Sequence, residues 1–159
     1  LPNRNLITLL LEKEYSKITR NIDECCVAFA DIDHFKYVND NYGHASGDRV
    51  LVEISKYFST SIRPYDSVGR YGGEEFIFCF PQTDLNTGKK ILERVRSGIE
   101  ELSICVDESS TIKVTCSFGL SRMCADNSLA EIIEQADNAM YRAKNEGRNR
   151  VEVWDCSKT

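Results

Sequence analysis

Residues 25–33 read Cys-Cys-Val-Ala-Phe-Ala-Asp-Ile-Asp. An unbroken apolar run of this length is typical of a strand that is buried on both faces, so we expect it at the centre of a sheet. Asp31 and Asp33 follow where the run ends. Asp31 is in phase with Val27 and Phe29, and a buried carboxylate there needs a bound metal or a charged donor as partner. Asp33 directly precedes a helical pattern, so helix capping and metal ligation are equally good interpretations of it.

The segments around this strand alternate between helical and extended patterns, which predicts a single α/β unit. Gly72-Gly73 between two apolar runs is typical of a tight hairpin, and Ser128 with Glu131 forms a capping box. The expected helices cover residues 6–22, 35–42, 50–62 with Ser46 and Asp48 in the first turn, 91–102, and 129 to a stop at Gly147; the other expected strands cover residues 68–71, 75–80, 112–118 and 151–154.

Composition limits the function classes. The chain has 159 residues and a formal charge of −5, which argues against a broad nucleic-acid footprint and leaves a small anionic ligand open. No apolar run approaches the roughly 20 residues that span a bilayer, and no signal-peptide pattern begins the sequence. Seven cysteines without CxxC spacing favour free thiols in a reducing cytoplasm over disulfides or zinc. A chain of this length can fold without a metal, so a metal would serve function.

Two further groups of residues could carry chemistry. Gly72 and Gly73 would let a ligand approach the backbone closely while Glu74 and Glu75 project from the turn, although an exposed turn is the plain alternative. If this hairpin lies beside the strand that ends at Asp31, one carboxylate from each could hold Mg²⁺. Lys144 and Arg148 flank the end of the last helix. They could bind phosphates or simply compensate the helix dipole.

Six ordered motifs extend this pattern along the chain: Asp31-Ile-Asp-His-Phe-Lys36, Asn39-Asp40, Gly43-His44, Gly47-Asp48, Arg70-Tyr-Gly-Gly-Glu-Glu-Phe76 and Tyr141-Arg-Ala-Lys-Asn-Glu-Gly-Arg-Asn149. Together with Leu1-Pro-Asn-Arg4 they resemble the GGDEF domain of bacterial diguanylate cyclases over essentially the whole chain. The resemblance implies an α/β (α+β) fold like the palm of nucleotidyl cyclases, with a central, mostly antiparallel sheet flanked by helices. It implies that residues 1–159 are one such domain, taken from a larger signalling protein.

The activity that the resemblance implies is condensation of two GTP into cyclic di-GMP and two pyrophosphates, with one GTP on each subunit of a homodimer. Mg²⁺, with Mn²⁺ as an alternative, would be held by Asp31, the carbonyl of Ile32 and Glu74. Glu74 would also accept the proton, and the role of Glu75 stays open. The resemblance further implies guanine recognition by Asn39 and Asp48, β- and γ-phosphate binding by Lys36, Lys144 and Arg148, and a place beside the nucleotide for His44.

This chain has Glu74 where the family name has Asp, a change that keeps the charge and the donor type. Arg63 and Asp66 match the RxxD motif at which the family binds its product as an inhibitor, and Arg94 would add a contact. The plain alternative for Arg63 and Asp66 is a surface ion pair. We expect inhibition by cyclic di-GMP through these residues.

The expected partners are GTP, cyclic di-GMP, a second copy of the chain and an N-terminal regulatory domain, without nucleic acid or direct membrane contact. The expected location is the cytoplasm. Two other hypotheses remain: a non-catalytic module that senses GTP or cyclic di-GMP, and a dimerisation element. Complete metal, guanine and phosphate positions favour the enzyme.

Overall fold

The computed structural model describes residues 1–20 and 23–155, so the expected helical position Ile22 lies outside the described residues. The elements in chain order are α1 (Arg4–Ile18), β1 (Cys25–Ile32), α2 (Phe35–Tyr42), α3 (His44–Ser61), β2 (Ser67–Arg70), β3 (Glu75–Pro81), α4 (Leu85–Glu101), β4 (Ile104–Cys105), β5 (Thr111–Ile112), β6 (Cys116–Met123), α5 (Leu129–Asn145) and β7 (Val151–Val153). Within the described residues, no helix is both long and apolar enough to cross a bilayer.

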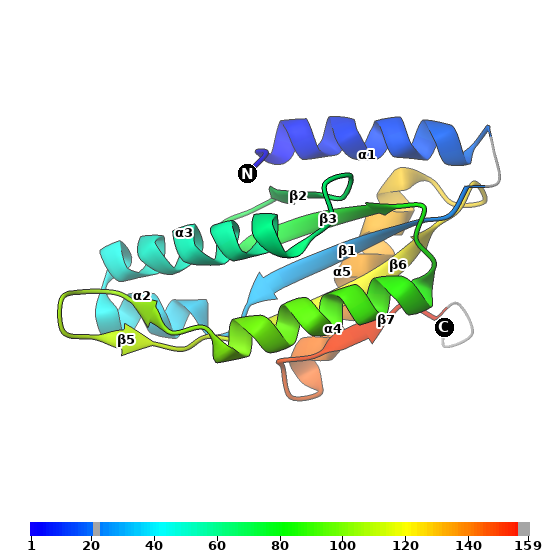
Figure 1. Cartoon of the computed structure of the whole chain (residues 1–159). Helices are drawn as coiled ribbons and strands as arrows, with labels where there is room; N and C mark the ends of the chain where they lie inside the picture. Colours follow the sequence, from blue (N-terminus) through cyan, green and yellow to red (C-terminus); the bar gives the residue numbers. More distant parts are fainter. Residues whose placement is uncertain (21–22, 156–159) are drawn as a thin grey trace.

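A five-stranded sheet of order β2-β3-β1-β6-β7 forms the centre of the fold (Figure 1). β1 lies in the middle and pairs antiparallel with both β3 and β6, while β6 pairs parallel with β7. Every residue of β1 is buried, because helices cover both faces of the sheet. The expectation of a central, doubly buried strand in a mostly antiparallel sheet is therefore confirmed.

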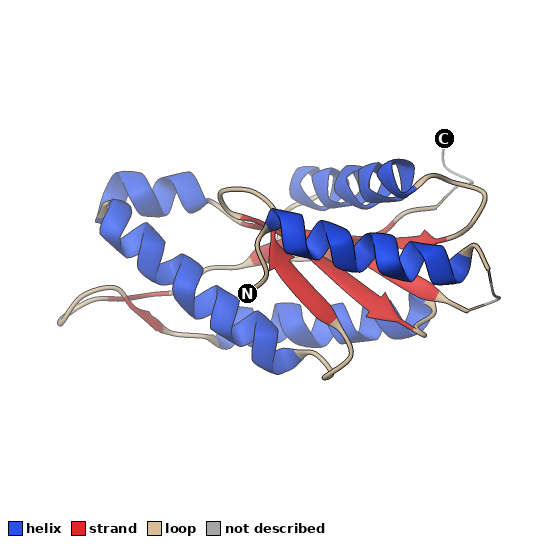
Figure 2. Cartoon of the chain, turned by 90° about the horizontal axis from the view of Figure 1, so that it is seen from above, coloured by secondary structure: helices blue, strands red, loops and turns tan. Residues whose placement is uncertain are grey.

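Alternate residues of β1 enter two separate hydrophobic cores. Ala28 and Ala30 face the core beneath α2, α3 and α4, where Phe58 contacts three other phenylalanines edge to face or nearly so. Val27 and Phe29 face the second core, beneath α1 and α5. Figure 2 shows α1 lying across the strands on this second side. Asp31 continues the phase of Val27 and Phe29, so its side chain leaves the sheet on the α5 side.

Three predicted details differ from the structure. The expected strand over residues 112–118 is two strands, β5 and β6, and β5 forms a small separate sheet with β4, which the sequence did not predict. Residues 113–115 leave the ladder because Thr115 bonds to Asp33 through both its carbonyl and its hydroxyl. α3 begins at His44, so Ser46 lies in its first turn as expected, whereas Asp48 lies just beyond that turn.

The hairpin between β2 and β3 is confirmed, but it is looser than a two-residue turn. Residues 71–74 connect the strands, and both glycines have negative or extended φ. The carboxylate of Glu75 packs against Gly72, where a β-carbon would force the end of that side chain to move. The predicted capping box of Ser128 and Glu131 is present at the start of α5, and its helix ends before Gly147.

Candidate active site

Asp31 and Lys144 form the centre of the candidate site. Asp31 is at the carboxyl end of β1 and is only 6% exposed, and its Oδ1 atom lies 2.7 Å from Nζ of Lys144 on α5. Apart from this ion pair, Oδ1 accepts no hydrogen bond from a described residue. Burial raises the pKa of Asp31, and the Lys144 ammonium opposes that rise. Lys144 thus does more than compensate a helix dipole: it neutralises a buried carboxylate.

The β2–β3 hairpin brings two more carboxylates to the same place. Glu75 is the antiparallel partner of Asp31 in the ladder, and the backbone N–H of Ile32 donates to the carbonyl of Glu74 at 3.3 Å. Partial burial and the nearby charge of Asp31 raise the pKa values of both Glu74 and Glu75. The adjacency that the sequence left conditional is therefore present, and three carboxylates repel one another at the end of β1.

Arg70 holds the loop that carries Glu74. Its guanidinium donates to the carbonyls of Gly72 and Gly73, at 2.7 Å for the shortest contact. Arg70 also lines a surface pocket of about 410 Å³ together with Leu1, Asp48 and Leu51. The pocket lies between α3 and Arg70, the last residue of β2.

Asn39 and Asp48 lie on neighbouring helices, α2 and α3. Asn39 is near the end of α2, and its side-chain amide packs against Gly47 on α3, where a β-carbon would collide with Oδ1 of Asn39. Asp48 follows directly and lines the pocket. The missing side chain at Gly47 thus leaves room for the Asn39 amide against α3, one residue before Asp48.

The remaining predicted ligand-binding residues surround this centre at exposed positions. Lys36 lies on the first turn of α2, and His44 is the first residue of α3. Arg148 is exposed in the loop between α5 and β7 and has a left-handed backbone, with φ of 62°. All three belong to segments that adjoin the carboxyl end of β1 or the end of α5.

Asp33 does not cap α2, and its carboxylate is held by other groups. His34 occupies the N-cap position of α2, without a side-chain cap. The carboxylate of Asp33 is buried and accepts hydrogen bonds from the hydroxyls of Thr115 and Ser117 and from the backbone N–H of Asn149. The helix-cap interpretation of Asp33 is therefore wrong, whereas metal ligation stays a prediction; the contacts of Asp33 tie β1 to β6 and to the loop before β7.

The residues present fit a hard cation that takes part of its coordination from a ligand. Among the described residues, His, Cys, Asp and Glu form no group of three arranged around one metal position. However, Asp31 offers a buried oxygen whose present partner is a cation, and partial burial together with the charge of Asp31 raises the pKa values of Glu74 and Glu75. Mg²⁺ commonly binds through one or two carboxylates plus substrate phosphates, and this donor set suits that mode.

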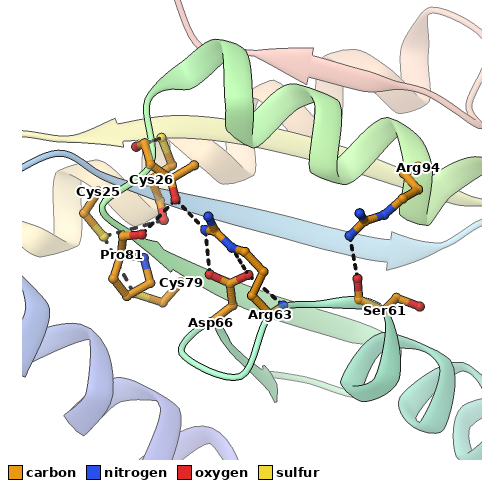
Figure 3. Close-up of polar contacts among 9 residues, drawn as sticks. Cys25, Cys26, Ser61, Arg63, Asp66, Cys79, Pro81 and Arg94 are labelled. Carbon is orange, nitrogen blue, oxygen red and sulfur yellow. Dashed lines mark hydrogen bonds and ion pairs between the residues drawn. The ribbon is translucent and has the colours of Figure 1, made fainter.

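A second cluster surrounds Arg63 (Figure 3). Its Thr83 bonds to Glu24 just before β1, so the cluster lies at the opposite end of β1 from Asp31. Asp66 is buried and accepts from Nε and Nη2 of Arg63 at 2.9 and 2.8 Å, and Nη2 also donates to Thr83. The guanidinium carbon lies 4.5 Å from the ring centre of Tyr65. Arg94 on α4 donates to the carbonyl of Ser61 at 2.8 Å. This arrangement is more than a surface ion pair, because one of the two charges is fully enclosed.

The sequence reasoning missed several residues of both clusters. Thr83 was not singled out, and Arg70 was quoted only as the first residue of the hairpin motif, although each supports a predicted residue. Asp137 on α5 has a pKa raised chiefly by burial, and its charge raises the pKa of Glu75. Asp137 precedes Lys144 by seven residues, which is two turns along the same face of α5. This spacing could have indicated that Asp137 lies near the site.

Comparison with known proteins decides the family. The family model described as "Diguanylate cyclase, GGDEF domain" matches residues 1–150. The chain belongs to the GGDEF domain family. Curated relatives include diguanylate cyclase DgcP of Pseudomonas aeruginosa, 38% identical over 96% of this chain, and diguanylate cyclase A of Treponema denticola, 42% identical over 91%. The chain spans 23% and 39% of the lengths of these two proteins.

Solved GGDEF domains have the same fold. The GGDEF domain of DgcB from Caulobacter crescentus, in complex with c-di-GMP, is 30% identical and superposes with a TM-score of 0.91 over 96% of this chain and 91% of that one. The active GGEEF domain of a diguanylate cyclase from Vibrio cholerae is 29% identical, with a TM-score of 0.90 over 98% of each chain. The GGEEF sequence of this chain, residues 72–76, therefore also occurs in an active relative.

Proposed function

We propose that this GGDEF domain is a diguanylate cyclase that condenses two GTP into cyclic di-GMP. In each of two reactions, the 3′-hydroxyl of one GTP attacks the α-phosphorus of the other, a P–O bond forms, and pyrophosphate leaves while the hydroxyl proton is taken up by a base. The observation that carries the proposal is the buried Asp31 beside Glu74 and Glu75 at the end of β1, with the Lys144 ammonium against it.

Asp31, the carbonyl of Ile32 and Glu74 would hold Mg²⁺, or Mn²⁺ in its place. When bound, the ion offsets the negative charge that develops on the phosphate oxygens. Glu74 would accept the proton of the 3′-hydroxyl, and its raised pKa brings it closer to the range that suits a general base. Glu75 would add negative charge at the same place.

Binding of GTP is assigned to the surrounding groups. Asn39 and Asp48 would recognise the guanine edge, because its N–H groups are donors that a carboxylate and an amide oxygen can accept. The pocket of about 410 Å³ at Asp48 supports this place for the base. Lys144 would exchange part of its contact with Asp31 for phosphate oxygens, joined by Lys36 and Arg148, with His44 nearby.

Two subunits are required, because each supplies the nucleophile for the GTP on the other. A single domain binds one GTP in the proposed site, so turnover should rise with protein concentration until dimers form. A regulatory domain elsewhere in the protein would set that encounter.

The experiment is chromatographic product analysis after concentrated protein is incubated with GTP and Mg²⁺. We expect cyclic di-GMP and pyrophosphate from the wild type, no product from ATP, and no product from Glu74→Gln, which keeps the size of the side chain and removes its charge. Product from Glu74→Gln at the wild-type rate would refute the role of Glu74. Tight GTP binding without product, at concentrations where dimers form, would favour a sensing module.

We also propose that cyclic di-GMP inhibits the enzyme by binding at Arg63, Asp66 and Arg94. The contacts to Asp66 and Tyr65 hold the Arg63 guanidinium in one orientation at a partly exposed position, which preorganises it for a guanine or a phosphate. Arg63→Ala should raise the inhibition constant for cyclic di-GMP at least tenfold, on the order of one lost charged hydrogen bond, with the initial rate unchanged. An unchanged inhibition constant would refute the assignment.

A further inference from the structure

The loop that carries Arg148 is held in an unusual conformation. Gly147, Arg148 and Asn149 have φ values of 118°, 62° and 46°, so three successive residues adopt the left-handed region. Residues other than glycine rarely do so, and Asn tolerates this region better than most. Such a conformation persists only where the surroundings fix it.

Two contacts fix this loop, and both converge on Asn149. Its backbone N–H donates to Oδ2 of the buried Asp33 at 3.0 Å. Its side-chain Oδ1 accepts from Nη1 of Arg96 on α4 at 2.9 Å. Asp33 is itself held by Thr115 and Ser117, at 2.7 and 2.6 Å. Asn149, the residue next to Arg148, is therefore held by Asp33 at the end of β1 and by Arg96 on α4.

Arg96 is rigid enough to serve as an anchor. Its side chain is 19% exposed, and it also contacts Glu93 and Glu100 on its own helix at 2.8 and 3.0 Å. The backbone N–H of Arg148 meanwhile donates to the carbonyl of Ala143 at the end of α5, at 2.9 Å. Arg148 is thus fixed in its backbone while its guanidinium remains exposed.

We propose that Asn149 is a positioning residue, which Asp33 and Arg96 hold so that Arg148 points toward the β- and γ-phosphates of GTP. The inference rests on the proposed function, in which Arg148 binds those phosphates. It gives Asp33 a role other than metal ligation or helix capping. It also predicts that substitution of Asn149 weakens the binding of nucleotides that carry β- and γ-phosphates and leaves the binding of GMP unchanged.

Calorimetric binding of a non-hydrolysable GTP analogue and of GMP tests the proposal on the 159-residue protein. Asn149→Ala removes both the Arg96 contact and the tolerance for left-handed φ. This conformational cost lowers the fraction of protein molecules whose loop has the conformation that binds phosphate. The dissociation constant of the analogue should therefore rise about tenfold. That of GMP should stay within about twofold. Asn149→Asp keeps the acceptor and the φ tolerance and should restore most of the affinity.

Three further single variants and one double variant separate the positioning of Arg148 from general damage to the fold. Arg96→Met should weaken binding of the GTP analogue and leave binding of GMP unchanged. Glu100→Ala removes only another partner of Arg96 and should change the binding of neither nucleotide. Arg148→Ala should weaken binding of the GTP analogue. The double variant Arg148→Ala/Asn149→Ala should bind the analogue no more weakly than Arg148→Ala alone, because Asn149 acts through Arg148.

Equal losses for the analogue and GMP in Asn149→Ala, or losses that add to those of Arg148→Ala, would overturn the proposal. Wild-type protein that binds the analogue, with Arg148→Ala weaker and Asn149→Ala unchanged, would overturn this inference and leave the proposed function standing. Wild-type protein that binds no GTP analogue at all would overturn both.

Discussion

Replacement of Lys144 by Met should destabilise the protein through the carboxylate that it leaves behind. Asp31 is 6% exposed, and the side chain of Lys144 is 23% exposed. Removing one partner of a fully buried ion pair costs about 3–5 kcal/mol, whereas exposed pairs contribute about 0–1 kcal/mol. This pair is intermediate, so we expect a loss of about 2 kcal/mol at pH 7. For a domain of this size, that loss lowers Tm by roughly 4–8 °C.

Thermal and urea denaturation followed by circular dichroism measure this loss, and a second substitution tests its cause. If the unpaired charge is responsible, Asp31→Asn in the Lys144→Met background should recover the stability to within about 1 kcal/mol of wild type, because no charge is then buried. A Lys144→Met variant as stable as wild type would refute the reasoning. So would a double variant whose loss equals the sum of two separate losses.

The same pair predicts a dependence on pH. Burial raises the pKa of Asp31 above its ordinary value of 3.8, and removal of Lys144 raises it further. A carboxyl with a higher pKa in the folded protein binds its proton more tightly there, so lowering the pH from neutrality toward that ordinary value favours folding. The deficit of Lys144→Met should therefore shrink between pH 7 and about pH 5. A deficit that grows over this interval would contradict the assigned cause.

Three smaller predictions concern packing and capping. Gly119→Ala should cost about 3 kcal/mol in urea denaturation, because a β-carbon there would collide with backbone atoms of Ala136 and Met140 and push α5 off the sheet. Gly73→Ala is the matched control, since an added β-carbon there meets nothing within 4 Å, and its stability should stay within about 0.5 kcal/mol of wild type. Ser128→Ala should lose about 1 kcal/mol and some helicity at the start of α5; full retention of both would mean that the capping box contributes nothing.

The sequence predicted those features that depend on local pattern. The apolar run from Cys25 identified β1 and its central place, because a strand between two helical layers carries hydrophobic residues on both faces. The Ser128 capping box located the start of α5 in the same way. The hairpin and its acidic pair were also readable, since glycines and carboxylates stand together in the chain.

Features that depend on distant residues were not readable. The fate of Asp33 is set by Thr115, Ser117 and Asn149, which are 82 to 116 residues away in the chain. The two-residue strands β4 and β5 are too short to produce a pattern, and Thr115 interrupts the expected strand because it serves Asp33 instead. Likewise, nothing local to Arg70 indicates that it holds the carbonyls of Gly72 and Gly73.

The edges of the sheet restrict how two copies of this domain can meet. β2 has four residues and β7 has three, and the backbone N–H of Arg70 at the β2 edge already donates to the carbonyl of Pro2. Short, partly occupied edges are poor templates for backbone pairing between chains. Copies would therefore meet through side chains and bound nucleotides, a kind of contact that can be broken and remade. If two copies meet in the proposed reaction, such a contact lets them separate again without permanent pairing of their sheets.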